Sequence, residues 1–449
     1  MGTTSVDARQ GTLSYKLFWT WDHTTNWVLN TIGKQNCGVA NHYTKRPDTF
    51  VRDYLRVIDW SAANGVDAVG IVGLLRDVHG GFDSARRLCV YARERGVRVY
   101  LIAGLYAYGG IYYEGDSQLS LDRFLANNPD CMGQAMDGSP RYINFRYPYG
   151  YKKEPVACPS NPKVRNFVLD SLDYLFMVLP ELGGIQMEAG DSFQCLCDQC
   201  RARRAEMRGG EKRLPAFSLS DMAGIYPEAA DVIRSRSADA WVICETYTHY
   251  INNTAFSDVT SPAMQAMLKM PDETFWQWSD RHFGKRVWTE ADRLPEHLRR
   301  FRHVMRAHHS TQWDGGRGTL AVDSIRQQCR LSYAAGIQGV SMFGETSPFH
   351  ANTEFNYLAL QYFADHPMDS VQSFAEQVMA PRLGGTALAE RYLELAVLHK
   401  TPEKIPAAVR EIAKIISSIT GDDVLRRWTY LASFLNSYYW ESVQEKKAE

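Results

Sequence analysis

The sequence has neither the long apolar runs of a membrane protein nor the one-sided charge of a nucleic-acid-binding protein. None of its apolar stretches is long enough to span a bilayer. Its 50 basic and 51 acidic residues leave a formal net charge of −1. A balanced chain of this kind has no electrostatic preference for nucleic acid or for an anionic membrane. We therefore expect no nucleic-acid partner and no membrane partner.

The sequence also lacks a recognisable secretory signal. Residues 1–7 contain no basic segment followed by an apolar one. The cysteines number 9, and an odd count fits free thiols in a reducing compartment better than a disulfide framework. The sequence thus predicts a cytoplasmic protein, or a periplasmic or secreted one if a leader has been removed.

A third absence concerns the fold. No Gly-rich dinucleotide fingerprint follows the first apolar run, which counts against a doubly wound sheet. Short β-rich runs instead alternate with amphipathic helical segments. The expected strands are residues 17–21, 66–74, 97–105, 184–188, 240–245, 275–278, 310–313 and 339–343. Eight strands separated by helices predict an α/β fold of the (β/α)8 TIM-barrel type.

The length of the chain predicts a barrel with an appended region. Its 449 residues, 45% of them hydrophobic, can bury more than one average core. We expect the barrel over residues 1–355 and a C-terminal helical appendage over residues 356–449. Residues 106–157, rich in Tyr, Gly, Asn and Pro, are expected to form a long functional loop. The helix before the seventh strand is expected at residues 294–307.

Acidic and aromatic residues gather where the expected strands end. A barrel of this type builds its active site at the carboxyl ends of the strands. Aromatic faces stack on sugar rings, and a pair of carboxylates can cleave a glycosidic bond. We therefore expect a carbohydrate substrate. The candidate residues are Trp21, Asp22, His23, Tyr106, Glu188, Asp191, Glu245, Tyr247, Trp278, Trp313, Asp314 and Glu345.

Four of these acids are candidates for catalysis. Glu188 follows an apolar strand, so we expect burial to raise its pKa and make it the general acid; a buried salt bridge is the alternative. Glu345 and Glu245 are the candidates for the second carboxylate, although Glu345 could instead begin a helix. Asp191 could orient Glu188, bind a substrate hydroxyl or cap the following loop.

The remaining candidates are expected to bind substrate. Asp22 and His23 are neighbours, and neighbours on a strand face opposite ways, so we expect His23 to contact substrate or to pack rather than to pair with Asp22. Where tryptophans alternate along a strand, one can line the pocket while the other packs under the helices. The expected substrate contacts are Trp21, Asp22, His23, Tyr106, Tyr247, Trp278, Trp313 and Asp314.

Three closely spaced cysteines follow the fourth strand. Cys195, Cys197 and Cys200 have the spacing of metal ligands, and Cys158 or Cys131 could supply a fourth. The sequence therefore indicates a structural zinc site, with reduced and packed thiols as the alternative. Catalysis itself is expected to need no cofactor.

Several segments carry a family resemblance. They are CPSNP at residues 158–162, the acidic end of strand four with CLCDQC at residues 195–200, GVSMFGE at residues 339–345, and the helical run at residues 374–390. Together they resemble (β/α)8 glycoside hydrolases of the α-glucuronidase and β-N-acetylhexosaminidase-like group. That resemblance implies an exo-acting glycosidase whose acid ends strand four, the position of Glu188.

The chain also departs from these families. Two residues separate Glu188 from Asp191, whereas substrate-assisted hexosaminidases carry an adjacent Asp-Glu pair. Met187 precedes Glu188, so the Asn-Glu pair of many retaining barrels is absent. The sequence therefore predicts a glycoside hydrolase acting on an oligo- or polysaccharide by paired carboxylates, without specifying the sugar. A sugar lyase or isomerase on the same barrel and a non-catalytic glycan-binding protein are the alternatives, and a homo-oligomer remains open.

Overall fold

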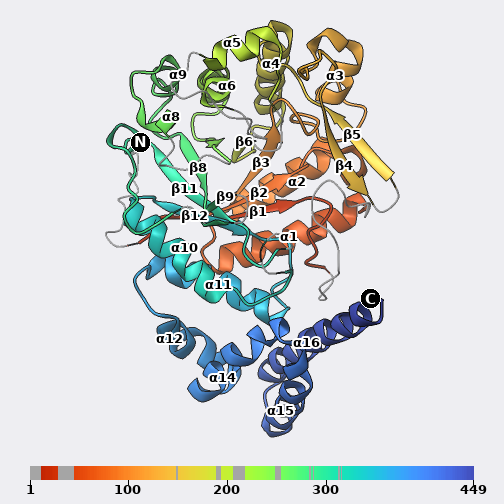
Figure 1. The fold of residues 1–449 in the computed structure, drawn as a ribbon, viewed down its shortest axis with the longest axis vertical. Coiled ribbons are helices and arrows are strands. Elements are labelled where there is room, and N and C mark those ends of the chain that lie inside the picture. The colour runs from red at the N-terminus through yellow and green to blue at the C-terminus, as the bar shows by residue number, and fades with distance from the viewer. Residues whose placement is uncertain are drawn as a thin grey trace.

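Eight parallel strands close into a barrel in the computed structural model of the protein (Figure 1). Around the barrel the order is β1-β12-β11-β8-β7-β6-β3-β2. The expected (β/α)8 fold is therefore confirmed. The strands are β1 Tyr15–Trp21, β2 Ala68–Val72, β3 Arg98–Gly104, β6 Gly184–Glu188, β7 Trp241–Glu245, β8 Phe275–Ser279, β11 Arg302–Ala307 and β12 Gly339–Phe343. The structure describes residues 12–28, 45–147, 150–188, 194–205, 218–247, 254–282, 285–286, 288–311, 314 and 316–448.

Helices cover the outside of the barrel, and local sequence signals fix their ends. The Asn161 side chain caps α4 by accepting a hydrogen bond from the Lys163 backbone N–H at 2.9 Å, and Pro162 suits the first helical position. Gly336, with φ of 83°, ends α10 in the left-handed conformation. The main outer helices are α1 Pro47–Ala63, α2 Gly81–Glu94, α4 Pro162–Val178, α7 Tyr226–Arg236, α10 Val322–Ala335 and α11 Ala351–Asp365.

The seventh barrel strand lies earlier in the chain than the sequence predicts. Residues 302–307 form β11, which pairs in parallel with β8 and β12. We expected a helix at residues 294–307, but the described part of this segment contains only the short 3₁₀ turn Glu296–Leu298 before β11. The strand is buried on both faces and carries His303 and Arg306, so the apolar alternation that marks a strand is missing.

Alternate residues of each strand point into the barrel or out towards the helices. The side chains inside the barrel form one apolar cluster, and those under the helices form a second, larger one. For residues near the carboxyl ends of the strands, this alternation determines whether the side chain faces the interior of the barrel or the surrounding helices. The inner cluster includes Leu17, Trp19, Trp21, Tyr100, Ile102, Ile243, Phe275, Val304 and Phe343.

The segment between β3 and α4, expected to be a loop, contains secondary structure of its own. It holds the short helix α3 Leu121–Asn127 and an antiparallel pair of strands, β4 Tyr142–Tyr147 and β5 Gly150–Pro155. This pair lies to one side of the barrel (Figure 1). The segment thus adds a small sheet, and Ile143 of β4 belongs to the apolar cluster inside the barrel.

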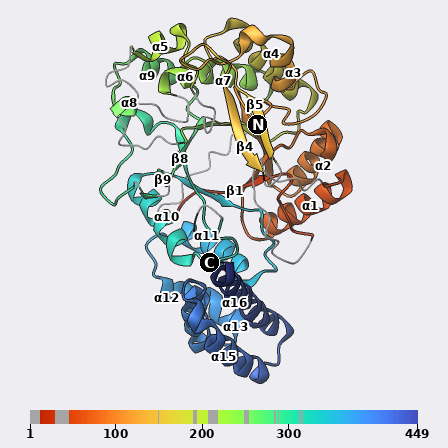
Figure 2. The same cartoon turned by 45° about the vertical axis from the view of Figure 1, so that its right-hand side comes forward.

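The C-terminal part of the chain is helical and lies beyond α11 (Figures 1 and 2). Helix α11 contacts α10, β12 and β1, so it completes the outer ring of the barrel. The expected domain boundary between residues 355 and 356 therefore falls inside α11. The later helices are α12 Val371–Phe374, α13 Ala380–Leu383, α14 Thr386–Ala396, α15 Ile405–Ser418 and α16 Asp422–Ala448.

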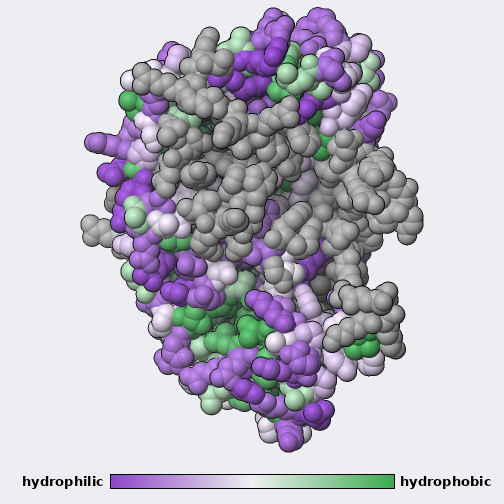
Figure 3. Space-filling model, viewed as in Figure 1, coloured by the Kyte–Doolittle hydropathy of each residue, from purple (hydrophilic) through white to green (hydrophobic). Residues whose placement is uncertain are grey.

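The surface of the helical region mixes apolar and polar side chains. Apolar side chains gather over the lower, helical part of the face in Figure 3. Large exposed apolar residues of this region include Met368, Val397 and Trp440. Among the residues that the structure describes, no helix combines the length and apolar character needed to cross a bilayer.

Candidate active site

Two glutamates end neighbouring strands of the barrel. Glu188 is the last residue of β6 and Glu245 the last of β7. The register pairs Met187 with Cys244, so the two glutamates follow at adjacent positions on strands about 4.8 Å apart. Gln186 donates towards Glu245 inside the barrel, and Glu188, two residues later, therefore faces the same interior. Both acids lie where barrel enzymes place their chemistry.

Glu245 is held by groups from three other strands. Arg306 Nη1 on β11 lies 2.8 Å from Glu245 Oε1. The amides of Gln186 on β6 and Gln277 on β8 each donate to the same oxygen at 3.5 Å. Glu245 is 1% exposed. A guanidinium and two amides around a buried carboxyl group stabilise its charged form.

Glu345, just after β12, is bound through both of its oxygens. The backbone N–H of Trp21 donates to Oε1 at 2.8 Å, and Arg317 Nη2 lies 2.7 Å from Oε2. Burial raises the pKa of Glu345, while Arg317 and a hydrogen bond from Thr24 act in the opposite direction. Glu345 thus ties the end of β1 to the segment that follows β11.

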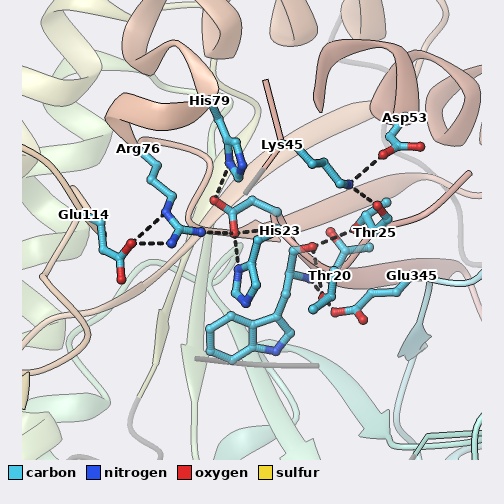
Figure 4. Close-up of polar contacts among 12 residues, drawn as sticks. Thr20, His23, Thr25, Lys45, Asp53, Arg76, His79, Glu114 and Glu345 are labelled. Carbon is cyan, nitrogen blue, oxygen red and sulfur yellow. Dashed lines mark hydrogen bonds and ion pairs between the residues drawn. The ribbon is translucent and has the colours of Figure 1, made fainter. Parts of the chain in front are cut away.

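A second polar cluster surrounds Asp22, which follows the end of β1; Figure 4 shows its labelled members His23, Arg76 and His79 pointing toward one another. Asp22 Oδ1 accepts from the backbone N–H of His23 at 2.7 Å and lies 2.7 Å from His23 Nδ1. Its Oδ2 lies 2.8 Å from His79 Nδ1, and Arg76 Nη1 is 3.5 Å from Oδ1. Burial alone would raise the pKa of Asp22, but His79 and His23 hold it well below its usual range.

The contact between Asp22 and His23 corrects an expectation. We expected neighbouring side chains to face opposite ways, as they do within a strand. Strand β1 ends at Trp21, however, and residues 22–24 form a turn. The alternation therefore no longer applies at Asp22, and its side chain can reach that of His23.

The segment after β3 adds to this cluster. Glu114 forms an ion pair with Arg76, which also lies over the ring of Tyr113 at 5.3 Å from the centroid. Tyr108 and Tyr113 belong to the apolar cluster inside the barrel. The rings of both meet Trp21 edge to face, with centroids 6.2 and 6.1 Å away. The residues after β3 thus supply aromatic and charged groups at the end of the barrel.

Two of the expected substrate contacts face away from the interior. Trp278 is wholly buried, stacks on Trp276 and donates from Nε1 to His303 Nδ1 at 3.0 Å. Tyr106 is also buried in the layer between the barrel and the helices. We expected both at the substrate. Trp278 faces outwards because it alternates with the inward-facing Gln277, whereas Tyr106 lies beyond the end of β3 at Gly104, where the strand alternation no longer applies.

The other expected aromatic and acidic contacts lie near the strand ends. Trp21 belongs to the interior cluster and is 8% exposed. Tyr247 follows β7 with a φ of 47°, and its ring lies 5.6 Å from the Arg306 guanidinium. Asp314 Oδ2 is 3.8 Å from His309 Nδ1. Asp191 and Trp313 lie outside the described residues.

The four cysteines meet beside this site. The sulfur atoms of Cys158, Cys195, Cys197 and Cys200 all lie within 4.8 Å of one another. Of the two partners that we considered for the triplet, Cys158 is therefore the one in the group. Such a cluster could hold a metal ion.

Sequence reasoning missed several polar residues inside the barrel. Gln186 lies two residues before Glu188, and Gln277 lies between the two tryptophans of β8. Gln186 could have been identified from the sequence, because it is the one amide in an apolar strand and lies two residues before the acid at the strand end, on the same face of the strand. Arg306 was missed because its strand was expected to be a helix.

Comparison with solved structures shows the fold. A GH138 enzyme targeting pectin rhamnogalacturonan II matches with a TM-score of 0.53 and 10% identity over 96% of this chain. The match covers 57% of that enzyme, so the present chain spans a little over half its length. At this identity the likeness establishes a common fold and nothing more.

Two further matches have lower TM-scores. The α-amylase from Geobacillus thermoleovorans matches with a TM-score of 0.45 and 9% identity over 80% of both chains. The cyclic α-maltosyl-(1→6)-maltose hydrolase from Arthrobacter globiformis matches with a TM-score of 0.43 and 13% identity over 79% of this chain and 83% of its own. No protein-family model and no curated protein sequence matches the chain. The resemblance to the α-glucuronidase and hexosaminidase group therefore stays a prediction.

Proposed function

We propose that this chain is a glycoside hydrolase whose reacting carboxylates are Glu188 and Glu245. The observation that carries the proposal is the pair of glutamates ending neighbouring barrel strands and facing the interior. Glycosidic hydrolysis needs two carboxyl groups, one to protonate the leaving oxygen and one to act on the other side of the sugar. The barrel fold shared with known glycosidases agrees with this interpretation.

The surroundings of the two glutamates favour different roles. Glu245 lies beside Arg306, which suits a carboxylate that must stay charged as nucleophile or base. Glu188 is 7% exposed at the end of β6, and burial disfavours the charged form of a carboxyl group. We therefore assign the general acid to Glu188 and the second carboxylate to Glu245.

The proposed reaction balances with these two groups and water. The Glu188 carboxyl group gives its proton to the glycosidic oxygen as the bond from that oxygen to the anomeric carbon breaks. Glu245 either attacks the anomeric carbon, forming an ester that water later hydrolyses, or removes a proton from an attacking water. The first route retains and the second inverts the anomeric configuration.

Glu345 remains the alternative second carboxylate, but its contacts favour a positioning role. Both of its oxygens are engaged, by the Trp21 backbone and by Arg317. In this proposal Glu345 fixes the end of β1 and so the ring of Trp21.

The substrate contacts that we propose are Trp21, Tyr247, Asp22, His23 and Asp314. Trp21 and Tyr247 offer aromatic faces near the strand ends, and the other three offer polar groups for hydroxyls. Exo action on an oligo- or polysaccharide, implied by the family resemblance, belongs to the same proposal. Asp191 and Trp313 remain candidates from the sequence.

The proposal is tested with a panel of aryl glycosides, including glucuronides, together with plant and bacterial oligosaccharides. Release of sugar is the expected result. It should be abolished in Glu245→Gln, and in Glu188→Gln it should fall strongly for leaving groups that need protonation. A product absorbing in the ultraviolet without net uptake of water would instead indicate a lyase. A sugar product of unchanged mass would indicate an isomerase. Tight glycan binding without any product, unaffected by either substitution, would indicate a binding protein.

A further inference from the structure

The four clustered cysteines come from two segments that flank the site. Cys158 lies between β5 and α4, whereas Cys195, Cys197 and Cys200 follow β6. Cys200 lies in α5 Asp198–Ala205. The cluster therefore joins two connections at the carboxyl end of the barrel, one of which begins directly after Glu188.

The distances between the sulfur atoms match those around a single tetrahedral metal ion. Cys158 Sγ lies 3.6 Å from Cys195 Sγ, 3.8 Å from Cys197 Sγ and 3.7 Å from Cys200 Sγ. A tetrahedral zinc ion with Zn–S bonds of about 2.3 Å holds its sulfur atoms about 3.8 Å apart. A disulfide would bring two of them to about 2.05 Å, and the eight cysteines that the structure describes are all free.

Hydrogen-bond donors surround the thiols, as they do around metal-bound thiolates. The backbone N–H of Gln134 donates to Cys195 Sγ at 3.3 Å. Ser160 Oγ lies 3.0 Å from Cys200 Sγ, and Arg203 Nη1 donates to Ser160 Oγ at 2.7 Å. Groups of this kind orient thiolate ligands and stabilise their negative charge.

Two arginines, both paired with Asp221, leave one positive charge to offset part of the charge that such a site would carry. Four thiolates around a divalent ion leave two negative charges. Arg203 Nη2 lies 4.0 Å from Cys200 Sγ, and Arg204 donates to the carbonyl of Cys195. Asp221 forms ion pairs with both guanidinium groups and so fixes their positions.

We propose that Cys158, Cys195, Cys197 and Cys200 bind one structural zinc ion. Four protein ligands leave no open position for a substrate or a water, which is the pattern of a structural rather than a catalytic site. Sulfur atoms this close to one another surround one ion rather than an iron–sulfur cluster. The ion fastens the connection after β6 to the start of α4. This proposal does not depend on the proposed reaction.

The first experiment measures metal in the purified full chain. Protein produced in zinc-supplemented medium should contain about one zinc per chain, released by an organomercurial that caps thiols and detected with a chromogenic zinc indicator. Cobalt(II) in place of zinc should give the intense thiolate-to-metal absorption of a tetrahedral four-sulfur site. Stoichiometric iron, or reduced protein that takes up neither zinc nor cobalt, would overturn the proposal.

Substitutions test the ligand set. Cys197→Ser should lose the zinc and change the cobalt spectrum. The matched control is Cys131→Ser. Cys131 is also buried and lies next to the group, since its carbonyl accepts a hydrogen bond from the Cys158 N–H at 2.9 Å, but it is not one of the four clustered cysteines. That variant should keep its zinc. Full zinc content with an unchanged cobalt spectrum in Cys197→Ser, or zinc loss from Cys131→Ser equal to that from Cys197→Ser, would contradict the assignment.

Discussion

Arg306 Nη1 lies 2.8 Å from Glu245 Oε1, an ion pair inside the barrel between two strands that are not neighbours. Strand β8 separates them and contributes Gln277 to the same carboxylate. The side chain that we propose as nucleophile or base is therefore oriented by groups from β6, β8 and β11. Such groups fix the direction of a reacting carboxylate before substrate arrives.

Removal of Arg306 should damage both stability and turnover. Arg306→Met leaves the buried Glu245 carboxylate without its cation, which typically costs about 3–5 kcal/mol. Thermal unfolding should show a clear fall in midpoint, and adding Glu245→Gln should recover part of it. The control is Arg52→Met, because the Arg52 side chain is 60% exposed and its ion pair with Asp48 spans 3.8 Å. Equal midpoints for Arg306→Met and Arg52→Met would contradict this account.

The buried pair of Trp278 and His303 predicts a pH dependence of stability. Burial lowers the pKa of His303 to about 4. In the unfolded chain the same imidazole takes up a proton near pH 6.5, so protonation between these values favours the unfolded state. The stability contribution of neutral His303 is present above pH 6.5 and is lost as pH falls towards 4. Between pH 7.5 and pH 5 the loss should amount to about 2 kcal/mol.

His303→Gln separates this effect from the other titrations. Glutamine can donate to the Leu298 carbonyl, as His303 Nε2 does at 2.8 Å, but it takes up no proton. The variant should be less stable at pH 7.5 because glutamine packs less well than histidine at this position. Between pH 7.5 and pH 5, however, its unfolding temperature should fall by less than that of the unsubstituted protein. The same loss over that interval in both proteins would exclude His303 as its source.

Gly73 provides a test of the Asp22 cluster. Its φ is +75°, and a Cβ at this position would lie 2.6 Å from Asp22 Oδ2. Gly73→Ala should therefore displace the Asp22 carboxylate and lower both stability and activity. Gly96→Ala is the matched control, because Gly96 has φ of +71° with nothing within 4 Å of the added Cβ. It should cost only the backbone strain of about 1–2 kcal/mol. Gly73→Ala should lower the free energy of unfolding by more than Gly96→Ala does. Equal losses in the two variants would mean that Asp22 can move freely.

The sequence predicted the eight-stranded barrel because most strands end in recognisable turns. It predicted three members of the cysteine group because Cys195, Cys197 and Cys200 are close in sequence, and it left the fourth open between Cys158 and Cys131. It could not predict which side of a strand faces inwards, because a barrel strand is buried on both faces. Trp276 and Trp278 both point outwards, and Gln277 between them points inwards. The same loss of alternation concealed β11, whose polar residues Arg306 and His303 bond to Glu245 and Trp278 on other strands.

The central claim, that Glu188 is the general acid, is tested most directly by varying the leaving group. On the aryl glycosides of the sugar that the protein hydrolyses, Glu188→Gln should reduce kcat/KM about 10²–10⁴-fold for a phenyl leaving group. A 2,4-dinitrophenyl group needs little protonation, so its rate should fall far less. The control Glu94→Gln, at a side chain that is 67% exposed on α2, should change neither rate. Equal losses for both leaving groups, or no loss for either, would contradict the account.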